Sequence, residues 1–531
     1  MIRMARIGPI DQDSTHILIG GGIASLAAAT LLLRDARIDG RHIRIIEQSD
    51  TLGGSLDGSG NAQAGYLMRG GRMFEEHFAC TFALFDSIPS IDDPDCSVSA
   101  DIAAFNHKVV SQSRCRLVRN GRKAEDRYSL KLGWPDRLAL ARLMLARESG
   151  LAGRTIDSWF RQAFFDSNFW LFWSTMFSFS PWHSLVEMRR YMRRFIHLFP
   201  GLPTLSGIQR TRYNQYDSLI LPLQRWLSER GVTFTTGRAV TDVEIAGDTR
   251  ARLVTRIRLD DGEEIPVKPE DRVYLTLGSM TDGATYGSNH TVPPQLDQPG
   301  ASWRLWQRLA RTQRDLGRPE VFCGEPASTA WHSFTVTLDH PDFHAFMEQF
   351  SGNPSGTGGL VTFADSAWLM SIVMAHQPHF RDQPPGTLVF WGYGLRGDHR
   401  GNAVNKSMWE ANGEEILAEL AFQLRLDARQ RSWFEGARII PCRMPFITSQ
   451  FMPRLAGDRP PVHPKGAGNF AVIGQFCELA RDCVFTVEYS VRSAWEAVTA
   501  MTGNASPAPP VARTDRDPMV LMRAMRSLLV G

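Results

Sequence analysis

A glycine-rich loop between an apolar run and a helical pattern constrains the fold more than any other feature. Residues 16–19 read His-Ile-Leu-Ile and lead directly into Gly20-Gly21-Gly22-Ile23-Ala24-Ser25. A helical pattern follows to about residue 35, and a second apolar run, 43–46, ends at Glu47. In such a βαβ unit, Gly20 permits the tight turn and Gly22 lets a pyrophosphate approach the helix N-terminus. Glu47 is placed to accept the hydroxyls of an adenosine ribose, so we predict a dinucleotide site rather than a flexible glycine turn.

Later segments favour FAD over NAD as the dinucleotide. A glycine pair, 53–54, comes shortly after Glu47, and a strand pattern at 273–277 ends in Gly278-Ser279. Near the C-terminus, a strand pattern at 470–473 ends in Gly474, and a helix is expected at 486–500. We expect this late unit to return to the first domain, because it is too short to hold a core as an independent α/β unit.

These segments predict an α/β fold with a Rossmann-type FAD-binding domain assembled from discontinuous segments, a substrate domain and a mostly helical C-terminal tail. With 531 residues, the chain is too long for one core. We expect the FAD-binding domain at 14–90, 205–300 and 435–505 and the substrate domain at 91–204 and 301–434. A Pro-rich linker and an amphipathic segment occupy 506–531.

Composition and charge exclude several function classes. The formal net charge is +3, which provides no electrostatic footprint for nucleic acid. The seven cysteines form no C-x-x-C pair, so no metal site is predicted. Residues 1–15 lack the apolar run of a signal peptide, and we interpret the uncharged stretch 167–186 as buried rather than membrane-spanning, because it contains many polar groups. A cytoplasmic protein is the expectation.

A long series of motifs identifies a family. Arg69-Gly70-Gly71-Arg72 lies within 65–80, and 85–90 reads Phe-Asp-Ser-Ile-Pro-Ser. Further motifs lie at 188–191, 213–223, 278–281, 377–380, 391–394, 444–454 and 474–490. Together they resemble the oleate hydratase family, also called the myosin-cross-reactive antigen family, over most of the chain from residue 17 to about 500. The resemblance implies addition of water to the cis double bond of oleic acid, giving 10-hydroxystearic acid, with FAD required but no net redox change.

The resemblance also implies roles for residues, and the sequence departs from the family at several of them. Tyr191 corresponds to the tyrosine that protonates the alkene. The family's water-orienting glutamate is Met73 here, and two polar positions ahead of Gln-Pro-His are Val373 and Ala375, while His379 is kept. If the segment after Arg72 is helical, Glu76 shares a face with Met73 and offers a replacement carboxylate, whereas Glu75 points elsewhere; first-turn glutamates favoured by the helix dipole are the alternative.

We therefore assign candidate site residues in two groups. Ser25 stands at the third glycine position of the loop and is small enough for close helix–strand packing. The candidate catalytic residues are Tyr191, Gln215, Glu76 and His379. The candidate cofactor-binding residues are Gly20, Gly22, Ala24, Ser25, Glu47, Gly54, Ser55, Arg69, Gly71, Met73, Val240, Ser279 and Thr486.

Two sequence clusters bear on the chemistry. Arg189, Arg190, Arg193 and Arg194 surround Tyr191 in sequence and could stabilise its phenolate, or Tyr191 could be an interfacial aromatic among solvated arginines. The aromatic-rich stretch 159–182 suits either an acyl-chain channel or plain core.

The tail and the reaction each leave alternatives. The Met- and Leu-rich segment 519–529 could dock on its own domain, on a partner chain or on a membrane surface, and a monomer and a dimer both remain open. The expected substrates are an unsaturated fatty acid and water. The alternatives to a hydratase are an FAD-dependent redox enzyme or isomerase acting on fatty acids and a non-catalytic fatty-acid-binding flavoprotein.

Overall fold

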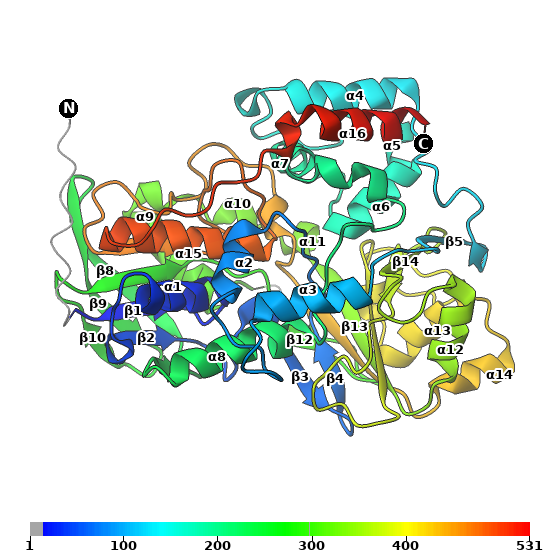
Figure 1. Cartoon of the computed structure of the whole chain (residues 1–531), viewed down its shortest axis with the longest axis horizontal. Coiled ribbons are helices and arrows are strands. Elements are labelled where there is room, and N and C mark those ends of the chain that lie inside the picture. Colours follow the sequence, from blue (N-terminus) through cyan, green and yellow to red (C-terminus); the bar gives the residue numbers. More distant parts are fainter. Residues whose placement is uncertain (1–13, 297, 531) are drawn as a thin grey trace.

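Five parallel strands form the sheet that carries the glycine loop. The computed structural model describes residues 14–296 and 298–530 (Figure 1). The strand order is β18-β11-β1-β2-β7, with β1 His16–Ile19, β2 Ile43–Ile46, β7 Thr233–Thr235, β11 Arg272–Thr276 and β18 Phe470–Ile473. In register, His16 lies opposite both Ile43 and Arg272. Strands from both ends of the chain thus share one sheet, which confirms the predicted discontinuous α/β assembly.

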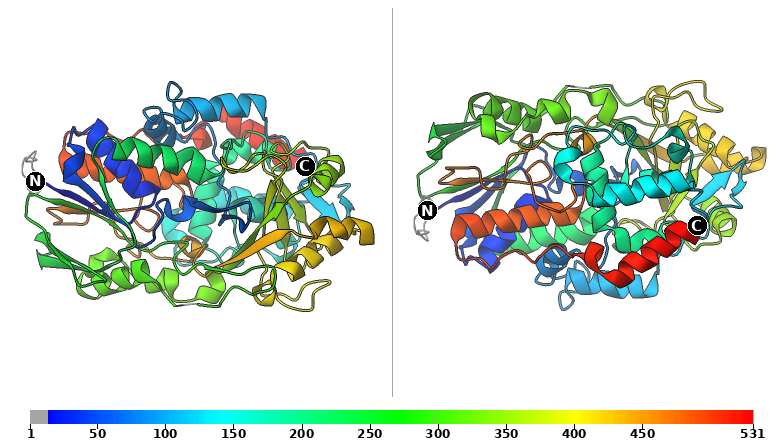
Figure 2. Two further views of the ribbon diagram at one scale, coloured as in Figure 1. Left: turned by 90° about the horizontal axis from the view of Figure 1, so that it is seen from below. Right: turned by 90° about the horizontal axis from the view of Figure 1, so that it is seen from above.

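Two helices from opposite ends of the sequence cover one face of this sheet. Helix α1 (Ile23–Arg34) packs against α15 (Val487–Thr502), and they lie side by side in Figures 1 and 2. The Ala- and Leu-rich residues 26–29 of α1 are fully buried, because β1 covers one side of the helix and α15 the other. Helix α8 (Leu221–Ser228) also packs on α1.

A second, larger sheet lies beside the first. Its order is β12-β17-β13-β16-β15-β14-β5-β6. The bounds are β5 Leu117–Arg119, β6 Arg122–Lys123, β12 Thr285–Tyr286, β13 Trp331–Leu338, β14 Leu360–Phe363, β15 Met370–Val373, β16 Leu388–Gly394 and β17 Arg438–Met444. Every residue of β13 is buried. The exact domain bounds stay a prediction, although β12 and β17, from the segments expected in the cofactor domain, pair within this second sheet.

Smaller elements complete the chain. An antiparallel sheet contains β8 Val240–Asp248, β9 Ala251–Leu259 and β10 Glu264–Pro266, and a two-stranded ribbon contains β3 Gly58–Asn61 and β4 Gly65–Met68. The remaining helices of the described chain are α2 Ala79–Phe85, α3 Val98–Lys108, α4 Trp134–Leu145, α5 Gln162–Phe165, α6 Asn168–Phe177, α7 Leu185–Arg194, α9 Ala301–Thr312, α10 Glu320–Cys323, α11 Pro326–Thr329, α12 Asp342–Ser351, α13 Gly413–Gln423, α14 Ala428–Arg431 and α16 Pro518–Val530, besides short single-turn segments.

The C-terminal helix docks on its own chain. Helix α16 packs on residues 196–201 and lies beside α4, where Arg137 donates a hydrogen bond to the carbonyl of Leu529 at 3.0 Å (Figures 1 and 2). Upstream of it, the Pro509 carbonyl accepts a hydrogen bond from Arg492 of α15. The linker and the helix therefore both pack on the body of the chain.

The aromatic-rich stretch is mostly core. Within it, Phe169, Trp170, Phe172 and Trp173 of α6 are buried, and Trp173 stacks on Phe169 with ring centroids 5.7 Å apart. Over residues 14–296 and 298–530, no helix has both the length and the apolar character needed to cross a membrane. The prediction that residues 1–15 lack a signal peptide falls mostly on residues 1–13, which lie outside the described part of the chain.

Candidate functional site

The glycine loop between β1 and α1 has the shape that a bound pyrophosphate needs. Gly20 has φ +93°, and a Cβ there would lie 3.1 Å from Thr276 Cβ. A Cβ on Gly22 would meet no heavy atom of the described chain within 4 Å, so space for a ligand lies over this residue. Ser25 is fully buried behind the loop, with its hydroxyl 3.5 Å from that of Thr276, as close helix–strand packing requires.

A cavity surrounds this loop, and we call it the glycine-loop cavity. Glu47 lines it, and its carboxylate accepts hydrogen bonds from the Gly21 N–H at 2.5 Å and the Ser49 N–H at 2.9 Å. Arg69 binds the Gly54 carbonyl at 2.8 Å and Asp57 at 2.7 Å. Nine of the predicted cofactor-binding residues line this cavity: Gly20, Gly22, Ala24, Glu47, Gly54, Ser55, Arg69, Val240 and Ser279.

Of the other four predicted cofactor-binding residues, Ser25 lies behind the loop, and Gly71, Met73 and Thr486 line a second cavity together with Tyr191. We call this the Tyr191 cavity; it holds about 790 Å³ of space, including its opening. Gln475 connects the two cavities, because it lines the glycine-loop cavity and donates a hydrogen bond to the Thr486 carbonyl at 2.8 Å. Thr486 also caps α15 by accepting a hydrogen bond from the Tyr489 N–H. The N-terminus of α15 therefore lies at the junction of the two cavities.

Tyr191 is the buried phenol of this second cavity. It projects from α7, and its hydroxyl donates a hydrogen bond to the Val484 carbonyl at 2.5 Å. Phe177, Phe179 and Phe451 pack around its ring. Burial raises the pKa of Tyr191 well above its ordinary value, so the side chain is a neutral proton donor near pH 7.

The arginine that acts electrostatically on Tyr191 is Arg72, not one of its sequence neighbours. Arg72 lines the Tyr191 cavity, its guanidinium lies 4.8 Å from the centroid of the Phe485 ring, and its charge lowers the pKa of Tyr191. Burial in turn lowers the pKa of Arg72 to about 10.

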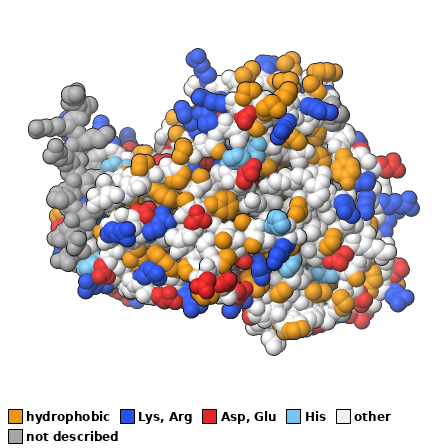
Figure 3. Space-filling view, viewed as in Figure 1, with side chains coloured by type: hydrophobic (Ala, Val, Ile, Leu, Met, Phe, Trp, Pro, Cys, Tyr) orange, Lys and Arg blue, Asp and Glu red, His pale blue; other side chains and the backbone are white. Residues whose placement is uncertain are grey.

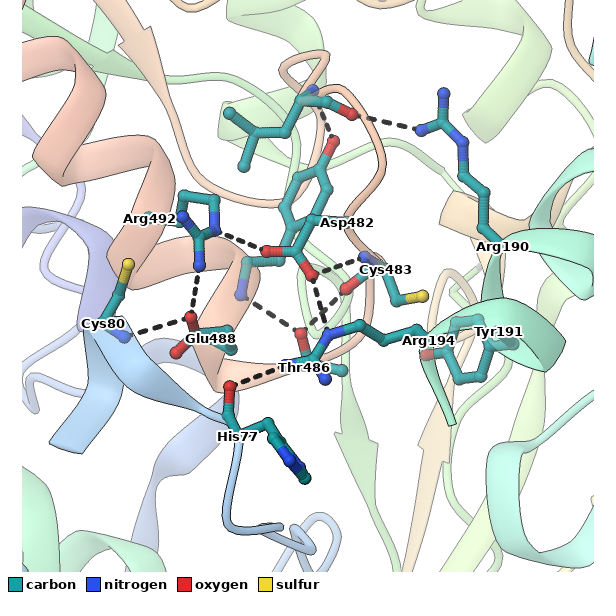
Figure 4. Close-up of polar contacts among 12 residues, drawn as sticks. His77, Cys80, Arg190, Tyr191, Arg194, Asp482, Cys483, Thr486, Glu488 and Arg492 are labelled. Carbon is teal, nitrogen blue, oxygen red and sulfur yellow. Dashed lines mark hydrogen bonds and ion pairs between the residues drawn. The ribbon is translucent and has the colours of Figure 1, made fainter. Parts of the chain in front are cut away.

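The four sequence neighbours are committed to acidic partners elsewhere. Arg189 and Arg190 pair with Glu148, Arg193 with Asp515, and Arg194 with Glu75 and Asp482. Figure 4 shows Arg194 reaching Asp482 and the His77 carbonyl. The expectation that these arginines stabilise the phenolate is corrected because each already pairs with a carboxylate, including Arg194, which lies three residues from Tyr191 on the same side of α7.

The prediction that Glu76 replaces the family glutamate is also corrected. Residues 70–78 form no helix; Phe74 makes an antiparallel bridge with Gln209, and a turn follows at 76–77. In an extended segment, residues two apart share a side. Met73 and Glu75 therefore both line the Tyr191 cavity, and the Glu75 side chain is only 2% exposed. Glu76 lines no described cavity, and its side chain is 74% exposed.

Glu75 is held by three cationic or histidine groups. Its carboxylate lies 2.8 Å from Arg194 Nη1, 2.9 Å from His77 Nδ1 and 3.1 Å from His197 Nε2. Burial alone would raise the pKa of Glu75, but the hydrogen bonds from His197 and His77 and the charge of Arg194 outweigh it and hold the pKa below its ordinary value. Atoms of Glu75, His77 and His197 that could coordinate a metal ion, a carboxylate oxygen and two ring nitrogens, lie within 4.8 Å of one another. The prediction of no metal site considered only cysteine spacing and so did not find this cluster. Because Arg194 already neutralises this carboxylate, we assign the cluster as an ion-pair network.

A third cavity collects buried polar groups that lack partners. We call it the Arg210 cavity, and it holds about 650 Å³, including its opening. Its polar lining consists of Arg72, Arg210, Thr211, Gln215, His376 and His379. Nε and Nη2 of Arg210, and both ring nitrogens of His379, make no hydrogen bond within the described chain. Burial lowers the pKa of Arg210 to about 10 and that of His379 to about 4, so His379 is neutral near pH 7.

The Tyr191 and Arg210 cavities share a wall. Gly71, Arg72, Met73, Leu360 and Trp391 line both. Val373 and Ala375, the apolar replacements noted in the sequence, line the Arg210 cavity. Of the phenylalanines and tryptophans in the aromatic stretch, only Phe177 faces a described cavity, so the stretch is mostly core, one of its two predicted roles.

Two residues of this site were missed at the sequence level. Arg72 stood in a quoted motif but was given no role, since nothing local indicates that it lies near Tyr191. Arg210 precedes the family-like segment at 213–223. Its significance depends on its buried Nε and Nη2 and on the lack of an acidic partner in the described chain, which only the tertiary structure reveals.

Comparisons with known proteins give the family and the fold. The model of the MCRA family matches residues 13–499. An oleate hydratase from Streptococcus pyogenes is 38% identical and covers 92% of this chain and 85% of its own length. A linoleate hydratase from Lactiplantibacillus plantarum is 31% identical and covers 97% of this chain and 98% of its own length.

Solved structures with low sequence identity share the fold. Cyclohexylamine oxidase from Brevibacterium oxydans has a TM-score of 0.54 at 15% identity, covering 92% of this chain and 99% of its own. An oxidoreductase from Methanosarcina mazei has a TM-score of 0.51 at 14% identity, covering 91% and 99%. At such identity the likeness concerns the architecture alone.

Proposed function

The chain belongs to the MCRA family, and from this premise we propose that it adds water across the cis double bond of a long unsaturated fatty acid. Oleic acid, with 10-hydroxystearic acid as the product, is the first candidate substrate. The names of the two curated relatives, an oleate hydratase and a linoleate hydratase, support this substrate class.

The observation that carries the proposal is the pairing of a buried phenol with a partly buried arginine across adjoining cavities. The Arg210 side chain is only partly exposed, its Nε and Nη2 are buried without a hydrogen bond, and it has no acidic partner in the described chain, which costs free energy. A fatty acid carboxylate would supply the missing counter-charge. Gln215 and His379 line the same polar end and could hold the second carboxylate oxygen. The acyl chain would then extend along the shared wall toward Tyr191.

Tyr191 is the proposed proton donor. Protonation of one alkene carbon by the phenol leaves a carbocation at the other carbon and a phenolate on the tyrosine. Arg72 is the cation that acts on this phenolate, and general acid catalysis of this kind is worth about 10²–10⁴-fold. The aromatic rings around Tyr191 keep bulk water away from the cation, so that one positioned water attacks it.

We further propose that the cofactor is FAD. Open space over Gly22, the end of β2 at Glu47 and the N-terminus of α15 at Thr486 fit a dinucleotide that extends from the glycine-loop cavity to the Tyr191 cavity. When bound, the cofactor would supply fixed dipoles to the reaction without a net redox change. The residues that would hold it are the thirteen assigned from the sequence, except Ser25, which supports the loop from behind.

One surface suggests where the substrate is acquired. Trp134, Leu138 and Leu145 of α4 and Met522 and Met525 of α16 are exposed large hydrophobic residues. Figure 3 shows hydrophobic side chains gathered with arginines on the lobe that these helices form. Such a surface fits peripheral contact with an anionic membrane. Met522→Glu/Met525→Glu should then reduce sedimentation with phosphatidylglycerol vesicles, and unchanged sedimentation would contradict the contact.

The activity test incubates the purified protein with FAD and oleic or linoleic acid while the flavin absorbance is recorded. A hydroxy fatty acid without flavin reduction is the expected result. Flavin reduction in step with substrate loss would favour a redox enzyme. Fatty acid binding without any product would favour a non-catalytic flavoprotein, the candidate that the replacement of the family glutamate by Met73 supports.

A further inference from the structure

We propose that Glu75 binds the attacking water and accepts its proton, because Met73, at the position of the family glutamate, has no carboxylate to do so. This inference rests on the proposed hydratase function and adds a catalytic residue to it. Glu75 is the single carboxylate among the described residues that line the Tyr191 cavity. It comes from the same extended segment as Met73 and lines the same cavity, two residues further along.

The carboxylate of Glu75 has capacity for a water molecule. Oε2 accepts the hydrogen bonds from His77 and His197, at 2.9 and 3.1 Å. Oε1 contacts Arg194 but makes no hydrogen bond of acceptable geometry within the described chain. Oε1 is buried, but a carboxylate oxygen has two acceptor positions, so it keeps an unused one for a water proton while the ion pair with Arg194 persists.

The surroundings keep Glu75 ionised and oriented. His77 and Glu76 lie in its own segment, Arg194 faces it from α7, and His197 from the turn that follows α7. Asp482 also contacts Arg194, at 3.7 Å (Figure 4). Three cationic or histidine groups therefore hold one buried carboxylate. The resulting low basicity is no obstacle, because the oxonium formed when water attacks a carbocation is a far stronger acid than a carboxylic acid.

The proton balance closes without a co-reactant. The phenol O–H of Tyr191 breaks and a C–H bond forms at one alkene carbon; the oxygen of water then bonds to the other carbon. The oxonium loses one proton to Glu75, with His77 and His197 in hydrogen-bond contact to share it. That proton finally returns to the Tyr191 phenolate, so one alkene and one water become one alcohol, and nothing is oxidised or reduced.

The test compares two adjacent glutamates. Glu75→Gln should lower kcat with oleic acid by about 10²–10⁴-fold and leave the dissociation constant for the fatty acid unchanged. Glu76→Gln is the matched control, since its side chain is exposed, and it should keep wild-type kcat. Adding Met73→Glu to Glu75→Gln returns a carboxylate to the same side of the segment and should restore kcat in part.

The outcomes separate this proposal from the proposed function. If the wild-type protein makes a hydroxy acid and Glu75→Gln keeps its kcat, the role of Glu75 is overturned and the hydratase stands. If the wild-type protein makes none, both are overturned. Should Glu75→Gln fail to fold, Glu75→Asp keeps the charge opposite Arg194 but withdraws the carboxylate; kcat should fall by about 10²-fold, and an unchanged kcat overturns the proposal.

Discussion

The glycine-loop cavity and the adjoining Tyr191 and Arg210 cavities are built in opposite ways. In the first, consecutive backbone groups shape the site, and its charged residues are already paired: Glu47 with backbone N–H groups and Arg69 with Asp57. In the other two, side chains from distant segments converge, and several of their buried polar atoms make no hydrogen bond within the described chain. A site formed by consecutive backbone groups can be predicted from the sequence. A site formed by side chains from distant segments cannot, because its composition depends on tertiary packing.

The largest expected effect comes from a substitution that removes the proposed proton donor of the Tyr191 cavity and leaves the glycine-loop cavity unchanged. Tyr191→Phe should lower kcat by at least about 10²–10⁴-fold and leave flavin content and fatty acid binding unchanged. Tyr393→Phe is the matched control, because Tyr393 also lines the Tyr191 cavity, is buried and donates a hydrogen bond to a backbone carbonyl. Equal loss of activity in both variants would mean that packing, not proton donation, is what Tyr191 supplies.

Arg210→Met should affect binding and stability in opposite directions. Loss of a charge-assisted hydrogen bond of about 1.5–3 kcal/mol weakens fatty acid affinity about 10–100-fold. The free protein should become more stable to urea, since a partly buried charge without an acidic partner in the described chain is removed.

Arg116→Met is the control for this prediction. Arg116 is more deeply buried than Arg210, lines no described cavity and donates hydrogen bonds to the Leu202 carbonyl and the Thr175 hydroxyl. We expect it to lower stability and spare affinity. If Arg210→Met lost stability and kept affinity as well, the carboxylate would bind elsewhere.

A substitution in the glycine loop should act on the cofactor alone. Gly22→Val adds a side chain where no described protein atom lies within 4 Å, so the fold is retained. It intrudes on the ligand space, and we expect flavin binding to weaken by about 1–3 kcal/mol. Gly20→Val should instead destabilise the protein, because Gly20 has φ +93° and faces Thr276. Flavin titration with thermal unfolding distinguishes the two; undiminished flavin affinity in Gly22→Val would contradict the assigned site.

Acid should weaken the fold through the Arg210 cavity. The pKa of His379 is about 4 in the folded protein, against 6.5 for an exposed histidine. Between these values the unfolded chain binds more protons than the folded chain, so stability falls as the pH drops from 6.5 toward 4. The loss is about 2 kcal/mol at pH 5. Urea midpoints at pH 7 and pH 5 should therefore differ less in His379→Asn than in the wild type, and an equal difference would contradict a neutral buried His379.

Much of the fold could be predicted from the sequence, and the errors have identifiable causes. The strands at 16–19, 43–46 and 470–473 and the helix that begins near 23 were predicted because glycine turns bound them and their apolar patterns are local. Docking of the tail on its own chain, one of three alternatives, also occurs. The helix assumed after Arg72 was wrong because pairing of Phe74 with Gln209 overrides local preference. Because of that error, Glu76 rather than Glu75 was predicted to share a side with Met73.

Incorporation of oxygen from water tests the central claim most directly. Purified protein with FAD is incubated with oleic acid in ¹⁸O-labelled water, and the products are read by mass spectrometry while the flavin spectrum is followed. The account predicts 10-hydroxystearic acid that carries ¹⁸O, no net flavin reduction, and loss of this product in Tyr191→Phe. Unlabelled product, oxidised product with reduced flavin, or unchanged oleic acid would contradict it.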